Sequence, residues 1–238
     1  VTLTFASFGG FFYSTGADSV WVHLFAQGTA DLNVGGQSVQ LRQITNFPWS
    51  GDVKFEVGLS ARQRFGLHLR VPAWCKSWAL RVNGVPVANQ QPQPNGYLLI
   101  EREWHAGDVI EYAMDMRVQV VWAHPAVRYL QGRMAIQRGP LVYCLEGVDH
   151  DNIALDQISL DPARVLSEAF SVEFCPDLLG GVSVLRGKGL AVDQDQWQEG
   201  LYGSQAPATR EIEITAIPYY VWDHRAAGEM RVWFRAKA

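Results

Sequence analysis

Paired carboxylates are the first residues in this sequence that could do chemistry. Glu101 and Glu103 lie two apart in a segment with strand-like alternation, which places both on one face, roughly 7 Å apart. Glycoside hydrolysis uses two carboxyl groups at about 5–10 Å, and one of them must be desolvated so that its pKa rises. Arg102, Trp104 and His105 flank this pair, so we interpret it as a solvated strand end. The same interpretation applies to Asp149, Asp151 and Asp156.

Cysteine, glutamate and histidine near residue 145 could ligate a metal. Cys144 and Glu146 share a strand face and His150 follows them, but a zinc site needs three or four converging ligands. Cys144 lies in an apolar segment where cysteine behaves as a small buried hydrophobe, so we favour a structural role. Cys75 could be a reactive thiol if Lys76 lowered its pKa, yet a structural role is favoured there and for Cys175. We therefore predict no catalytic, cofactor-binding or metal-ligating residue.

Aromatic side chains are the remaining candidates, because sugar rings stack on exposed Trp and Tyr rings. The densest cluster spans residues 218–222, and a further tryptophan precedes it. In a strand-rich protein such rings more often fill the core, where each buries a large apolar area. A sugar-stacking surface is kept as the alternative interpretation, with four residues: Trp197, Tyr219, Tyr220 and Trp222.

Composition limits the classes of protein to which this sequence can belong. Its 238 residues include 24 acidic and 20 basic side chains, a net charge of −4, and 48% hydrophobic residues. This is a globular composition, long enough for one large or two small domains. A pI near 5.9 without a basic run argues against a nucleic-acid partner. No apolar stretch approaches the ~20 residues of a membrane helix, so no membrane partner is expected.

The elements that must position these residues are strands, because the hydrophobic pattern has a period of two almost throughout. Tight hairpins are expected at Gly35-Gly36 and at Asn83-Gly84. The glycine-rich segments 179–181 and 186–189 are interpreted as turns. A helix is expected over residues 4–12, and one helical turn over residues 161–166 with Asp161 as its N-cap.

The closely spaced strands, with no alternation of strands and helices, predict an all-β fold. We expect an antiparallel β-sandwich. Two packed sandwiches and one elaborate sandwich fit the pattern equally well, and two packed sandwich subdomains are taken as the prediction. The pattern changes after Gly147. We therefore expect a short N-terminal helix and linker over residues 1–15, a first sandwich region over 16–147, and over 148–238 a second sandwich or the completion of the first.

Several phrases along the chain resemble the C-terminal part of glycoside hydrolase family 127, the β-L-arabinofuranosidase-like family. The most specific are Gln137-Arg138-Gly139-Pro140-Leu141-Val142-Tyr143-Cys144-Leu145-Glu146 and Ala216-Ile217-Pro218-Tyr219-Tyr220 followed by Trp222. Others occur in the same order at residues 12–15, 21–25, 45–51, 70–75, 82–84, 96–98 and 103–108. The resemblance covers nearly the whole chain.

The resemblance implies an N-terminal (α/α)6 barrel with the active site, followed by β-sandwich domains. It also implies retaining hydrolysis of β-L-arabinofuranosides by a cysteine nucleophile on a zinc ion, with a glutamate as acid/base. Relatives carry the nucleophile motif before a helix that ends in a segment like residues 6–14 of this sequence. We therefore expect the barrel and its zinc to be absent from the chain, and residues 1–15 to be the remnant of the last barrel helix. The three cysteines do not match the family's zinc ligands.

Three functions remain open for such a chain. We expect an accessory, non-catalytic β-sandwich portion of a β-L-arabinofuranosidase-like glycoside hydrolase, inactive alone and partnered by the missing barrel. The alternatives are an independent carbohydrate-binding module for an arabinose-containing glycan, and a structural or oligomerisation domain that pairs with a second copy. Free cysteines are compatible with a reducing interior, so we expect a cytoplasmic location.

Overall fold

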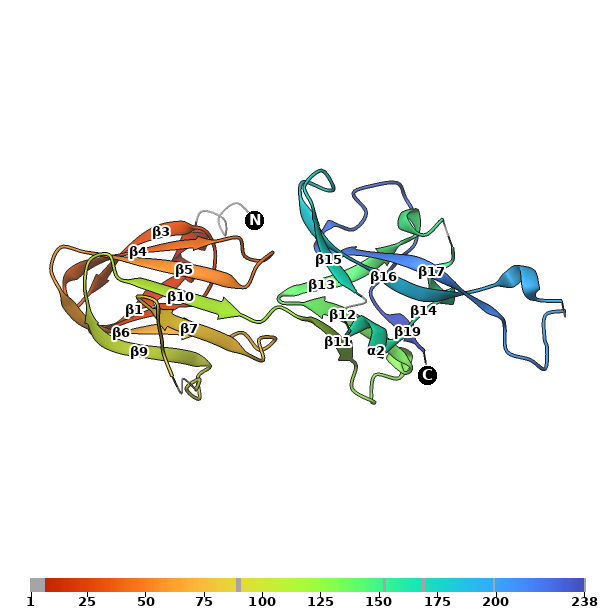
Figure 1. Cartoon of the computed structure of the whole chain (residues 1–238), viewed down its shortest axis with the longest axis horizontal. Coiled ribbons are helices and arrows are strands. Elements are labelled where there is room, and N and C mark those ends of the chain that lie inside the picture. Colours follow the sequence, from red (N-terminus) through yellow and green to blue (C-terminus); the bar gives the residue numbers. More distant parts are fainter. Residues whose placement is uncertain (1–6, 89–90, 152, 168–169, 199, 238) are drawn as a thin grey trace. The chain divides into compact units, whose positions relative to one another are not determined.

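The computed structural model describes residues 7–88, 91–151, 153–167, 170–198 and 200–237. The all-β fold expected from the sequence is confirmed, and the chain divides into two compact units, residues 1–116 and 117–238 (Figure 1). The expected helix over residues 4–12 lies partly outside the described residues. Its described end includes the 3-10 helix η1 (Phe8–Phe11), directly before strand β1. No helix in the described ranges is long and apolar enough to cross a membrane.

The division at residue 116 replaces the boundary expected at residue 147. Strands before residue 147 pair with strands near the end of the sequence: β12 (Arg133–Arg138) pairs with β19 (Phe234–Ala236), and β13 (Leu141–Glu146) with β17 (Thr209–Pro218). Hydrogen bonding between strands thus joins both sides of the expected boundary. The polar break that suggested it is a loop with the 3-10 helix η3 (Gly147–Asp149) inside the second unit.

Two sheets form the first unit. One has the order β1-β2-β6-β9, and β2 and β6 are parallel. The other has the order β3-β4-β5-β10-β7-β8 and all its pairings are antiparallel. The bounds are β1 (Tyr13–Thr15), β2 (Ser19–Val22), β3 (Gly28–Val34), β4 (Gln37–Thr45), β5 (Asp52–Leu59), β6 (Gln63–Arg70), β7 (Trp78–Val82), β8 (Val85–Pro86), β9 (Tyr97–Trp104) and β10 (Val109–Met114).

The core of the first unit lies between these sheets, because alternate side chains of each strand point inward. Leu67 and Leu98 of the four-stranded sheet and Phe55 of the six-stranded sheet belong to one buried cluster. The buried Tyr112 hydroxyl of β10 donates to the backbone oxygen of Arg70 on β6, at 3.3 Å, and so links the sheets. The expected hairpins are confirmed at Gly35-Gly36 and Asn83-Gly84, where all four residues have positive φ.

A single nine-stranded sheet forms the second unit, in the order β11-β12-β19-β14-β16-β17-β13-β18, with β15 on β16. An additional pairing of β12 with β13 closes six of these strands into a ring, as in a small barrel. Bounds not yet given are β11 (Val118–Trp122), β14 (Ile158–Leu160), β15 (Ser171–Cys175), β16 (Val182–Val192), β18 (Met230–Arg231), η2 (Arg128–Leu130), η4 (Leu155–Gln157), η5 (Gln194–Gln196), η6 (Tyr219–Val221) and α2 (Pro162–Val165). The predicted Asp161 N-cap of α2 is confirmed, because its side chain accepts from the Ala163 amide.

Strand β16 corrects the expectation of a turn at residues 186–189. The strand continues through this segment with both glycines buried. A Cβ on Gly187 would lie 2.5 Å from two carbons of the Phe170 ring, and one on Gly189 would lie 2.7 Å from a Leu160 methyl carbon. These glycines therefore make room for side chains that pack onto the strand. The turn expected at residues 179–181 is confirmed by three positive φ angles.

Replacing Gly187 with alanine is expected to lower the free energy of unfolding of the second unit by about 1–3 kcal/mol, because the added methyl group overpacks the buried Phe170 ring. Urea denaturation followed by tryptophan fluorescence measures the effect. Gly28→Ala is the control, since a Cβ at that strand position meets nothing within 4 Å. Equal stability of the two variants would contradict this account of β16.

Candidate functional site

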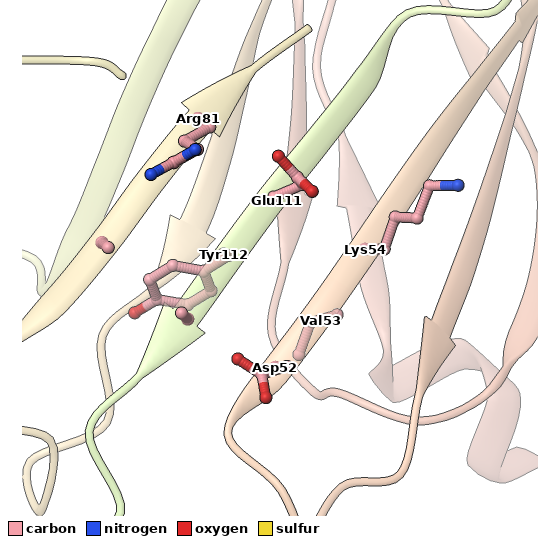
Figure 2. Close-up of a pocket in the computed structure, with 8 residues that line it drawn as sticks. Asp52, Val53, Lys54, Arg81, Glu111 and Tyr112 are labelled. Carbon is pink, nitrogen blue, oxygen red and sulfur yellow. The ribbon is translucent and has the colours of Figure 1, made fainter. Parts of the chain in front are cut away.

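A hollow of about 320 Å³ lies on the outer face of the six-stranded sheet, over strands β5, β10 and β7 (Figure 2). Strand register places its residues in two rows across these strands. One row runs Asp52–Ala113–Ala79, and the next runs Lys54–Glu111–Arg81. The intervening Val53 and Tyr112 are buried and point toward the core. The hollow exists because the first row carries two alanines where larger side chains would fill the space.

Four charged side chains border this hollow, two of each sign. Figure 2 shows Glu111 at the centre of the group, with Arg81 and Lys54 directed to opposite sides. Lys54 Nζ is 2.7 Å from Glu56 Oε1, so its ion pair runs along β5. Asp52 Oδ2 accepts from the Ser50 hydroxyl at 2.7 Å, which orients the carboxylate. None of these residues was singled out from the sequence.

The predicted aromatic residues lie in two places in the second unit. The rings of Tyr219 and Trp222 are parallel within 4°, with centroids 6.3 Å apart, and the residues are 42% and 40% exposed. Tyr220, between them on η6, is 56% exposed. Trp197 follows η5, and its indole Nε1 donates to the backbone oxygen of Gly200 at 2.5 Å. The structure therefore exposes three neighbouring rings at residues 219–222, and no ring contact among the described pairs joins Trp197 to them.

The buried Glu146 lies in an ion-pair network with Arg225 and Asp149, which are both partly buried. The Arg225 guanidinium donates to Glu146 Oε2 and to both carboxylate oxygens of Asp149, and the Asp223 amide donates to Glu146 Oε1 at 2.7 Å. The hydrogen bonds that Arg225 donates to Asp149 and Glu146 raise its pKa, so the guanidinium stays charged. The network fastens the segment after η6 to the end of β13.

His150 is also fully engaged. It is 3% exposed, its Nδ1 lies 2.7 Å from the backbone oxygen of Glu146, and its Nε2 accepts from the Thr215 amide at 3.3 Å. A carbonyl oxygen only accepts, so Nδ1 is assigned as the donor of this hydrogen bond. Nearby, burial raises the pKa of the Cys144 thiol to about 12. A thiol with a raised pKa is a poor nucleophile and a poor metal ligand at neutral pH.

The other chemical candidates have structural partners too. Glu101 pairs with Arg64 at 2.9 Å, Glu103 lies 3.6 Å from Arg62, and both carboxylate side chains are about half exposed. The interpretation of this pair as a solvated strand end is confirmed. Burial raises the pKa of the Cys75 thiol, which donates to the Ser77 carbonyl oxygen at 3.1 Å, so Lys76 does not activate it.

Comparison with known protein families decides the identity of the two units. Residues 19–116 match the model of the β-L-arabinofuranosidase GH127 middle domain, and residues 118–235 match that of the glycoside hydrolase family 127 C-terminal domain. The chain belongs to glycoside hydrolase family 127. The border between these domains coincides with the division of the structure at residue 116.

Other family 127 proteins resemble the chain over almost its whole length. It is 35% identical, over 92% of its length, to a non-reducing end β-L-arabinofuranosidase of Bifidobacterium longum, of which it covers 33%. A crystal structure of a GH127 β-L-arabinofuranosidase from Geobacillus stearothermophilus T6 superposes with a TM-score of 0.91 at 37% identity, covering 98% of this chain and 36% of that one. A second structure, of a GH127 β-arabinofuranosidase, superposes with a TM-score of 0.86 at 31% identity. This match covers 97% of this chain and 37% of the other. The chain thus spans about a third of these relatives.

The zinc ion that the family resemblance implies does not fit the described residues of this family 127 chain. No three His, Cys, Asp or Glu side chains come together as a metal-binding group among them. Cys144, Glu146 and His150 are the nearest approach in sequence, but the carboxylate of Glu146 and both ring nitrogens of His150 already hold protein partners. Ligating a cation would break the network that closes this part of the second unit.

Replacing Arg225 with alanine is expected to destabilise the second unit by about 3–5 kcal/mol, because Glu146 then remains buried without its cation. Chemical denaturation monitored by circular dichroism measures this loss. Arg164→Ala is the matched control, since its ion pair with Glu211 is exposed and contributes at most about 1 kcal/mol. The double variant Glu146→Gln with Arg225→Met is expected to recover part of the stability. A loss in Arg225→Ala no larger than in Arg164→Ala would show that Glu146 does not depend on this cation.

Proposed function

We propose that this chain is the accessory β-sandwich portion of a β-L-arabinofuranosidase-like glycoside hydrolase and is inactive alone. The observation that carries the proposal is the match of two adjoining family domains, a middle and a C-terminal one, over residues 19–116 and 118–235. Relatives that contain both are named β-L-arabinofuranosidases, and this chain covers about a third of them. Hydrolysis of β-L-arabinofuranosides with retention would then belong to the whole parent enzyme.

The side chains of the described residues support a non-catalytic role. A glycosidase needs one carboxyl group with a raised pKa within reach of a second carboxylate. The exposed Glu101 and Glu103 lie beside arginines, and the buried Glu146 is held by Arg225. The chemistry is therefore assigned to a separate catalytic barrel, which would also hold the zinc ion.

Exposed phenylalanines at the start of the first unit are a candidate contact for that barrel. Phe8 and Phe11 are 47% and 57% exposed, and the Phe8 ring contacts the Phe12 ring edge-on at 5.4 Å. Neighbouring apolar rings on a surface are typical of protein interfaces, so we assign these rings to the contact with the barrel.

The purified chain is expected to give no release of 4-nitrophenol from 4-nitrophenyl β-L-arabinofuranoside, with or without added zinc. The physical reason is that the candidate carboxylates Glu101, Glu103 and Glu146 lie beside arginines, and that burial raises the pKa of the Cys75 and Cys144 thiols. Absorbance at alkaline pH measures the product, and the Geobacillus stearothermophilus enzyme is the positive control. Zinc-dependent hydrolysis that co-purifies with this chain would overturn the proposal.

A second candidate function, binding of an arabinose-containing glycan, is favoured by the parallel rings of Tyr219 and Trp222. Both are partly exposed at neighbouring positions. Flat aromatic faces can pack against the C–H face of a sugar ring. In this function the chain would hold the parent enzyme near its polymeric substrate.

Trp222→Ala is expected to reduce the retardation of the chain in affinity electrophoresis through arabinan or arabinogalactan gels, by about tenfold or more in apparent affinity, because an aromatic anchor is lost. Tyr129→Ala is the control, since Tyr129 is 94% exposed in the same unit and has no stacking partner among the described rings. No retardation of the original chain, or equal retardation of the Trp222 variant, would exclude this function for residues 219–222.

A further inference from the structure

The hollow over β5, β10 and β7 holds hydrogen-bonding groups that the fold does not use. Glu111 stands opposite both Lys54 and Arg81 in the strand register, yet Lys54 pairs with Glu56 instead. Neither Glu111 nor Arg81 forms an ion pair or side-chain hydrogen bond with another described residue. Opposite charges on facing strand positions stabilise a sheet when they pair. Here the Glu111 carboxylate and the Arg81 guanidinium remain available to hydrogen-bond a ligand.

The floor of the hollow is apolar and flat. Ala79 and Ala113 face each other across β7 and β10, so their methyl groups lie side by side in the row that Asp52 ends, next to the charged row Lys54–Glu111–Arg81. Both residues are at least partly exposed. A volume of about 320 Å³ lies within the range of small-molecule sites. The space thus offers one apolar surface beneath a border of charged donors and acceptors.

The balance of charge defines the class of ligand. An anion would meet Glu111 and Asp52, and a cation would meet Arg81 and Lys54, so an ion of either sign faces repulsion from half of the border. A neutral ligand with several hydroxyl groups satisfies both halves, because each hydroxyl donates to a carboxylate and accepts from a cation. The C–H face of such a ring can rest on the two alanine methyl groups.

We propose that the hollow over Ala79 and Ala113 is a binding site for a neutral sugar. Arg81 donates to one sugar hydroxyl, Glu111 accepts from its neighbour, and Asp52, oriented by Ser50, accepts from a third. The site belongs to the middle domain, whereas the rings at residues 219–222 belong to the C-terminal domain. The choice of arabinose as the probe rests on the proposed function. The inference that the site binds a neutral sugar rests on the geometry of the hollow alone.

Two-dimensional 1H–15N NMR titration of the full chain with L-arabinose and arabino-oligosaccharides tests the site. Amide shifts are expected at Ala79, Arg81, Glu111 and Ala113, with millimolar affinity. Arg81→Ala and Glu111→Gln are each expected to weaken binding by about tenfold or more, since each removes a charge-assisted hydrogen bond. Ala113→Leu, which fills the hollow and keeps every charge, is expected to abolish the shifts.

Arg42→Ala is the matched control, because Arg42 is an exposed strand residue of the same sheet whose carboxylate partner is Glu56. D-galacturonate, a sugar with an added carboxylate, is expected to bind more weakly than neutral sugars. Shifts confined to residues 219–222, or arabino-oligosaccharide binding that Ala113→Leu leaves unchanged, would overturn this site. The absence of any amide shift would also overturn the sugar site. The proposed accessory role of the chain is tested separately, by the hydrolysis assay.

Discussion

The geometry of the first unit depends on the register of strand β10 with β5 and β7. Alternate residues of β10 point to opposite faces, so Ile110 and Tyr112 enter the core while Glu111 and Ala113 face outward. A shift of one residue would bury Glu111 and expose Tyr112. The large cost of burying an unpaired carboxylate, together with the bond from the Tyr112 hydroxyl to β6, therefore fixes both the core and the outer hollow.

The second unit relies on a different constraint. Its strands return to their starting point, and the segment after η6 is held to β13 by Arg225 through Glu146 and Asp149. Residues that appear chemically active in isolation, such as Glu146 and His150, are thus used for closure of the fold. This structural use of ionisable residues agrees with membership of family 127, whose middle and C-terminal domains match this chain. The relative that it resembles is about three times as long as this chain.

Local features were predictable from the sequence because their physical causes are local. The Asn83-Gly84 hairpin needs two residues that tolerate positive φ, and Asp161 caps α2 through a bond two residues away. Non-local features were not predictable. From the sequence alone Gly187 resembles a turn residue, and its role becomes visible only from the contact of β16 with the Phe170 ring. The hollow brings together Asp52, Ala79 and Glu111 from three strands whose order in the sheet does not follow the sequence. The domain border was misplaced for the same reason, since β13 finds its partner in β17.

The position of β19 has a consequence for biosynthesis. This strand lies between β12, which is made much earlier, and β14, with which it runs parallel. During translation the earlier strands can form their hairpin, but the gap between β12 and β14 stays open until residues 234–236 leave the ribosome. The nascent second unit therefore exposes two unpaired strand edges for most of its synthesis. In this interval a chaperone or a neighbouring domain that covered these edges would prevent their pairing with other chains.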